Sequence, residues 1–265
     1  MALQWSLRIL TGTAWLSGAI FALYILAFYL GAAQGGTPEL WNETLPDLYS
    51  AKRAPGANIG IGLHFALGAV ILLLGPVQLI SAVRLRWPRL HRWIGWISAP
   101  AAIATGLGGL AFIALRGTVG GPVMSFAFGL YGVLVVLSGV QTIRHAVARR
   151  LEVHRAWAIR LFALAIGSWL YRMDYGFWFL FAGKIGHTHE FSGAFDYFMD
   201  FWFYLPNLLV AEIAIRARGG AMSAGTKAIA AAVLGGAAAF LLLATYFFTT
   251  QMWGPSILWS LGLSA

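Results

Sequence analysis

The ionisable side chains inside apolar segments are the residues of this sequence best suited to chemistry. His64 lies in an apolar run over residues 58–83, and Arg172 and Asp174 lie in another over residues 155–182. Ionisable groups are costly in such runs, and those found there usually bind or transfer something. An aspartate beside a histidine can relay a proton, orient a quinol or fix a metal-ligating imidazole. We therefore expect these three residues to form a proton- or ligand-binding site.

The spacing of the three residues supports this expectation in part. If both runs are membrane-crossing helices, a rise of about 1.5 Å per residue places them at similar depth in the outer half. Two residues rotate a helix by about 200°, so Arg172 and Asp174 face nearly opposite directions. The alternative is a structural network, in which Arg172 pairs with an acid and His64 is hydrogen-bonded between helices.

Two histidines lie at the starts of predicted helices, next to arginines. His91 occurs in RLHRWIGW and His154 in EVHRAWAIR. We expect both imidazoles to approach one b-type haem iron near the inner membrane surface, with Arg92 and Arg155 holding its propionates. The alternative is a basic collar that binds anionic lipid headgroups. The chain has no cysteine, which excludes iron–sulfur clusters and covalent c-type haem.

Charged residues elsewhere suggest one ion pair and one weak metal candidate. Arg160 and Glu212 lie at similar depth near the inner ends of two predicted spans, and a pair between them is the cheapest way to hold both charges. The run HTHE places His187, His189 and Glu190 in an outer loop. Two imidazoles and a carboxylate can bind zinc or copper, but this spacing is no recognised motif, and flanking glycines indicate a mobile loop. We therefore expect no metal there.

The composition determines which elements must position these residues. Of the 265 residues, 60% are hydrophobic and only 10% are charged, whereas soluble domains average about 25% charged. This excludes a soluble enzyme, a disordered tail and a disulfide scaffold. We predict an all-α fold, a single integral membrane domain of seven transmembrane helices with its core over residues 58–182. The predicted spans are residues 9–32, 58–83, 93–115, 122–143, 155–182, 196–215 and 228–250.

The distribution of charge predicts an orientation. The formal net charge is +9, and arginines gather in alternate connections between the spans. By the positive-inside rule, these connections and the N-terminus lie inside, and the C-terminus lies outside. We expect the basic side to contact anionic lipid headgroups rather than nucleic acid. The arginines in question include Arg84, Arg86, Arg89, Arg92, Arg144, Arg149, Arg150 and Arg155.

Several of these residues also carry a resemblance to a known family. Over roughly residues 58–180, the sequence resembles an uncharacterised bacterial family of predicted membrane proteins, domain of unknown function 2306. The resemblance implies a multi-pass membrane protein with no established activity. We expect the protein to be integral to the bacterial inner membrane. The matching elements are His64, Gly75-Pro76-x-Gln78, Arg89-x-His91-Arg92 with Gly95, and His154-Arg155 with Trp157 and Arg160.

A looser likeness is to transmembrane b-type cytochromes, which place histidines on a four-helix core. A two-haem arrangement would need a histidine pair at each membrane face, and His64 is the only outer histidine within a predicted span. The likeness therefore implies one haem, while a second haem would need His187 or His189 to fold inward.

Three functions remain open from the sequence. The first is electron transfer, with haem b at His91 and His154 and a quinol at the outer site. The second is a carrier of a lipid, a proton or another small molecule, with His64, Arg172 and Asp174 as the binding site. The third is an accessory or structural subunit that packs with other membrane subunits. Whether the protein is an enzyme stays undecided.

Overall fold

The described part of the chain is helical throughout. The computed structural model describes residues 1–44, 48–52, 55–218 and 222–263, and no strand occurs among them. The first half contains α1 (Ala2–Tyr24), η1 (Ile25–Leu30), α2 (Gly31–Gln34), η2 (Pro38–Glu43), α3 (Pro55–Leu79), α4 (Ser81–Arg86), α5 (Pro88–Arg116) and α6 (Gly121–Val147). The second half contains α7 (Leu151–Ala165), α8 (Gly167–Ala182), α9 (Ala194–Trp202), α10 (Leu205–Arg218), α11 (Ala224–Phe248), η3 (Thr249–Trp253) and α12 (Gly254–Ser260).

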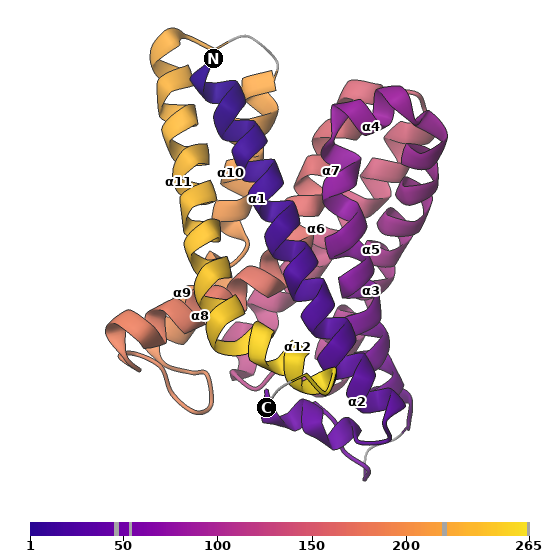
Figure 1. Cartoon of the computed structure of the whole chain (residues 1–265), viewed down its shortest axis with the longest axis vertical. Helices are drawn as coiled ribbons and strands as arrows, with labels where there is room; N and C mark the ends of the chain where they lie inside the picture. Colours follow the sequence, from indigo (N-terminus) through magenta and orange to yellow (C-terminus); the bar gives the residue numbers. More distant parts are fainter. Residues whose placement is uncertain (45–47, 53–54, 219–221, 264–265) are drawn as a thin grey trace.

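The long helices stand side by side as a bundle. Within the described ranges, six helices are long and apolar enough to cross a membrane. They are Ala2–Gln34, Asn58–Leu79, Pro88–Arg116, Gly121–Val147, Ala194–Ala217 and Ala224–Ser260. The N-terminus, α4 and the α6–α7 turn lie at one end of the bundle, and the C-terminus, α2 and α12 lie at the other (Figure 1). We call the first of these the basic end, because it carries Arg84, Arg86, Arg89, Arg144, Arg149 and Arg150.

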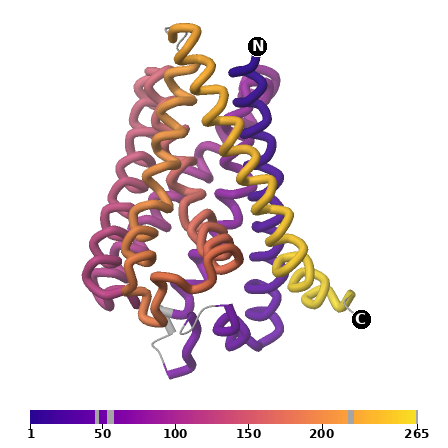
Figure 2. The backbone as a smooth tube through the Cα atoms, turned by 90° about the vertical axis from the view of Figure 1, so that its left-hand side faces the viewer, coloured from indigo at the N-terminus to yellow at the C-terminus, as the bar shows by residue number. Residues whose placement is uncertain are grey.

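The predicted span over residues 155–182 differs from the structure. The sequence indicated one continuous helix, but α7 ends at Ala165 and a separate helix, α8, starts at Gly167. α7 stands upright, whereas α8 lies across the bundle (Figure 1), and the view turned by 90° looks almost along its axis (Figure 2). This span is therefore absent from the six candidates.

The bend between α7 and α8 has identifiable partners. The Tyr131 hydroxyl, from α6, donates a hydrogen bond of 2.8 Å to the carbonyl of Leu164. Such a donor matters because a helix that ends inside a membrane leaves carbonyls that water cannot satisfy. A Cβ atom at Gly167 would lie 3.4 Å from the carbonyl oxygen of Phe203, so the small residue lets the bend pack closely against the α9–α10 junction.

Small residues also bring neighbouring helices together. A Cβ atom at Gly132 of α6 would lie 2.9 Å from the side chain of Leu110 on α5. At Gly75 of α3 it would lie 2.8 Å from Phe162 of α7. Close approach of this kind lets helices pack without a hydrophobic driving force between them. These contacts hold α3, α5, α6 and α7 together as the frame that supports α8.

Candidate functional site

A cavity lies among the helices on the side of α8 that faces the basic end. Its volume is about 410 Å³, and α1, α7, α8, α10 and α11 all contribute to its walls. That volume falls within the range of about 300–1,000 Å³ found for small-molecule sites. The walls are mostly aliphatic or aromatic, with Leu10, Phe162, Leu170, Val210 and Phe240 as representative side chains. A molecule held here would be surrounded mainly by hydrocarbon.

The polar side chains of the cavity are few, and one of them is unpaired. Three lining side chains carry an oxygen: Thr11, Asp174 and Asn207. The Thr11 hydroxyl donates to the carbonyl of Leu7 at 2.8 Å, and the Asn207 amide donates to that of Phe203 at 2.7 Å. Asp174 is half-buried and has no hydrogen bond or ion pair with any residue that the structure describes. Its carboxyl is therefore free to bind whatever enters.

The cavity is not sealed from the surroundings of the bundle. Trp202 is 47% exposed and Phe240 is 37% exposed, although both line the cavity. Gly236 of α11 is exposed as well, and a Cβ atom there would meet nothing within 4 Å. The wall between α9 and α11 thus opens at mid-helix, at a level where a bundle in a membrane is surrounded by lipid.

Arg172 lies on the other side of α8 from Asp174. Its guanidinium donates to the carbonyl of Ser168 at 2.9 Å, and its charge acts on His64 and Tyr24. No ion pair in the described part of the chain includes it. The structure thus brings His64 and Arg172 together and turns Asp174 away from both, as the rotation of about 200° between the two α8 residues requires. In the predicted three-residue cluster, Arg172 therefore lies with His64 of α3, and Asp174 lies on the opposite face of α8.

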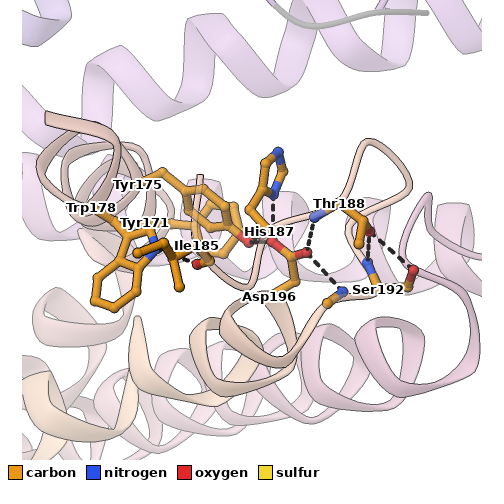
Figure 3. A network of polar contacts seen from close by, with 9 residues as sticks. Tyr171, Tyr175, Trp178, Ile185, His187, Thr188, Ser192 and Asp196 are labelled. Carbon is orange, nitrogen blue, oxygen red and sulfur yellow. Dashed lines mark hydrogen bonds and ion pairs between the residues drawn. The ribbon is translucent and has the colours of Figure 1, made fainter. Parts of the chain in front are cut away.

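A hydrogen-bonded network joins α8 to the loop that follows it (Figure 3). The Asp196 carboxylate accepts from Nδ1 of His187 and from the Tyr175 hydroxyl, both at 2.7 Å. It also accepts from the backbone amides of Thr188 at 3.0 Å and Gly193 at 2.9 Å. The Tyr171 hydroxyl donates to that of Tyr175 at 3.2 Å. One buried carboxylate therefore ties the loop, α8 and α9 together.

The loop is closely folded around this network. The Phe195 amide donates to the carbonyl of Gly186 at 2.9 Å, and a Cβ atom at Gly193 would lie only 2.0 Å from that same oxygen. The glycines that had indicated a mobile loop instead allow this close approach. The rings of Tyr175, Phe179 and Phe191 surround His187, whose side chain is 11% exposed.

A second buried carboxyl lies one helical turn from Asp196. Asp200 is fully buried, and neither of its oxygens has a hydrogen-bond partner in the described ranges. The Tyr204 hydroxyl, also fully buried, lacks one as well. Asp200 interacts electrostatically with Asp196, Tyr171 and Tyr204, none of which carries a positive charge. The sequence interpretation assigned Asp200 no role, although two aspartates one turn apart in the aromatic run FDYFMDFW were a usable signal.

The histidines of the basic end lie near one another. His91 interacts electrostatically with His154 and with Arg84. Nδ1 of His154 donates to the carbonyl of Thr142 at 2.9 Å, while Nδ1 of His91 is buried without a partner in the described ranges. Arg92 and Arg155 follow the two histidines directly in the chain.

Arg160 and Glu212 are in direct contact across α7 and α10. Nε of Arg160 donates to Oε1 of Glu212 at 2.5 Å, and the two side chains are 25% and 34% exposed. The guanidinium also lies 4.9 Å above the ring of Trp157. These contacts join the two helices near the basic end of the cavity.

The weak metal candidates are not brought together as a ligand set. In the ranges that the structure describes, no three His, Asp or Glu side chains are close enough to hold a metal ion. His187 is bonded to Asp196, whereas His189 and Glu190 are exposed.

Comparison with known proteins identifies the family of this chain. The family described as predicted membrane protein (DUF2306) matches residues 61–215, more than half of the chain. The matched region includes α8 and α9, with Asp174, Asp196 and Asp200, but not α1 or α11. No curated protein and no solved structure matches the chain. The chain therefore belongs to this family of membrane proteins, and the likeness to b-type cytochromes stays a hypothesis.

Proposed function

We propose that this family member binds a hydroxyl-bearing amphiphile, such as a quinol, that enters the cavity from the membrane. The observation that carries the proposal is the unpaired carboxyl of Asp174 in an otherwise apolar cavity. The apolar walls suit a hydrocarbon body, and Asp174 accepts a hydrogen bond from the head group. On this account the protein is a carrier or a receptor for such a molecule.

The chemistry of the lining favours a donor on the ligand. The Asp174 carboxyl can accept a hydrogen bond in either protonation state, and the oxygen of the Asn207 side chain accepts as well. A phenol or an alcohol matches these two acceptors, whereas an ether does not. The opening beside Trp202 and Gly236 gives such a molecule a lateral entrance.

The proposal is tested by titrating the detergent-purified protein with a short-chain quinol in a calorimeter. A hydrogen bond contributes about 0.5–1.5 kcal/mol, so Asp174→Leu should weaken binding by about 2- to 10-fold. The dimethyl ether of the same quinol keeps the ring and tail but cannot donate, and it should bind wild type as weakly as the quinol binds the variant. Equal affinity of quinol and ether would overturn the proposal.

A matched pair of glycine variants tests the place of binding. Gly236→Leu adds a side chain at the opening of the cavity, and Gly129→Leu adds one on α6 away from it; a Cβ atom meets nothing within 4 Å at either position. We expect quinol binding to be lost in Gly236→Leu and kept in Gly129→Leu. If both variants bind equally well, the site lies elsewhere.

We further propose seven membrane crossings, with α7 and α8 together forming the fifth. The termini at opposite ends of the bundle support an odd number (Figure 1). The arginines of the basic end, with exposed Trp93 and Trp96 beside them, support an inner position against anionic headgroups of a bacterial inner membrane. Because the chain has no cysteine, single cysteines can be introduced directly. An impermeant maleimide applied to intact cells should label Lys184→Cys but not Ala148→Cys; the reverse result would invert the orientation.

Haem b at His91 and His154 is a second candidate. The observation that favours it is their electrostatic proximity, with Nδ1 of His154 bonded to a carbonyl so that Nε2 is left for an iron. Arg92 and Arg155 would hold the propionates, and the group would supply one-electron chemistry. A reduced-minus-oxidised absorption spectrum tests this: haem bands that disappear in His154→Ala support it, and a colourless protein made with ample haem overturns it.

A further inference from the structure

The buried carboxyl of Asp200 has no place in the amphiphile site. It does not line the cavity, it is fully buried, and both of its oxygens lack a partner in the described part of the chain. A buried carboxylate without a counter-charge or hydrogen bonds is very unfavourable, so such a group takes up a proton instead. The ionisable groups that act on it are Asp196, Tyr171 and Tyr204, and none of them supplies a positive charge.

A chain of polar groups leads from the loop toward this carboxyl. It starts at His187, continues through Asp196 and Tyr175, and ends at the Tyr171 hydroxyl (Figure 3). Its three links measure 2.7, 2.7 and 3.2 Å. His187, at the entry, has a partly exposed side chain, whereas Asp196 is fully buried. The chain therefore connects a more accessible group to the interior.

The spacing along α8 and α9 extends the chain to Asp200. Tyr171 and Tyr175 lie one turn apart on α8, and Asp196 and Asp200 lie one turn apart on α9. Tyr175 is hydrogen-bonded to Asp196, and Tyr171 interacts electrostatically with Asp200. The Tyr171 hydroxyl donates to Tyr175 and the Tyr175 hydroxyl donates to Asp196, so both hydroxyls must rotate before the Tyr171 proton is directed toward Asp200.

We propose that Asp200 is a proton-exchange site, loaded from His187 through Asp196, Tyr175 and Tyr171. When a proton binds Nε2 of His187, the proton on Nδ1 moves to the Asp196 carboxylate. Asp196 gives a proton to the Tyr175 hydroxyl, which passes its own to Tyr171. Tyr171 passes its own proton to the Asp200 carboxylate, so one proton has moved in all. Asp196 and the two tyrosines keep their starting number of protons, and His187 changes from the Nδ1–H to the Nε2–H tautomer until its ring nitrogens exchange protons with the surroundings. The proposal does not depend on what occupies the Asp174 cavity.

The test follows the carboxyl group of Asp200 by infrared spectroscopy during exchange into D₂O. The band of a protonated carboxyl is assigned by its loss in Asp200→Asn, or by its shift in Asp200→Glu if the first variant does not fold. In wild type the band should shift promptly on exchange. Removing one hydrogen-bonded link, in Tyr175→Phe or His187→Phe, should slow this shift by about tenfold or more.

Matched controls separate a proton path from general loosening of the fold. His189 is exposed in the same loop and has no part in the chain, so His189→Phe should exchange like wild type. The amide bands should exchange at the same rate in all variants, because Phe keeps the ring contacts around α8. If the carboxyl band exchanges equally fast in wild type, Tyr175→Phe and His187→Phe, or if no band depends on Asp200, the proposal is wrong.

Discussion

Replacing Asp174 by leucine should make the protein more stable while removing its ligand. The carboxyl has no partner in the described part of the chain and faces apolar walls, so the folded state holds an uncompensated polar group. Proteins lose about 1–3 kcal/mol for a buried polar group without a hydrogen bond. Leucine removes this cost, and the cavity of about 410 Å³ has room for the larger side chain. A residue kept at a cost in stability is typical of a functional site.

The assay is thermal unfolding of the ligand-free protein in detergent. At roughly 2–4 °C per kcal/mol for chains of this size, a gain of about 1–3 kcal/mol should raise the Tm of Asp174→Leu by about 2–12 °C. Asp174→Asn removes the ionisable group but keeps a polar one, so its Tm should lie between those of wild type and Asp174→Leu. A Tm for Asp174→Leu several degrees below wild type would refute the reasoning, because it would mean that the carboxyl makes a stabilising contact.

Three further predictions concern the frame around the site. Glu212→Gln should lower the unfolding free energy by about 1–2 kcal/mol, because it leaves Arg160 without its carboxylate partner. The double variant Arg160→Glu with Glu212→Arg should restore most of this loss, and no recovery would count against a direct pair. Tyr131→Phe removes the α6 hydroxyl that donates to the last turn of α7, and it should lower the unfolding free energy by about 1 kcal/mol. Unchanged stability would mean that this hydrogen bond does not support the bend. Gly139→Ala puts a Cβ atom 2.5 Å from an α5 side chain and should lower the unfolding free energy by about 1–3 kcal/mol. Gly129→Ala, where a Cβ atom meets nothing within 4 Å, should leave it unchanged. Equal effects of the two variants would contradict the packing of α5 on α6.

Hydropathy predicted most of the long helices, but not the bend at Ile166. The apolar run over residues 155–182 contains no proline, and the Gly167-Ser168 pair at the bend is its local signal for a kink. The bend also depends on tertiary contacts: the Tyr131 hydroxyl satisfies a carbonyl of α7, and Phe203 packs against Gly167. Such partners lie far away in the sequence and are invisible to a periodicity argument.

The sequence identified Asp174 and Arg172 as candidate residues, but it did not show which other side chains lie near each of them. Asp174 and Arg172 were identified as ionisable groups in an apolar run, and their opposite directions follow from helix geometry alone. That Asp174 faces a cavity built largely by α1, α10 and α11 depends on how these helices pack against α7 and α8. The bond between His187 and Asp196 likewise depends on how the loop closes through Gly186 and Gly193.

The central claim, that the Asp174 cavity holds an amphiphile from the membrane, is tested most directly by native mass spectrometry of the gently purified protein. Wild type and Gly129→Leu should carry one additional mass, which extraction identifies as a hydroxyl-bearing amphiphile. Gly236→Leu, which enlarges a lining position of the cavity, should lack it. If the same mass is bound equally to all three proteins, or to none, the account of the cavity is contradicted.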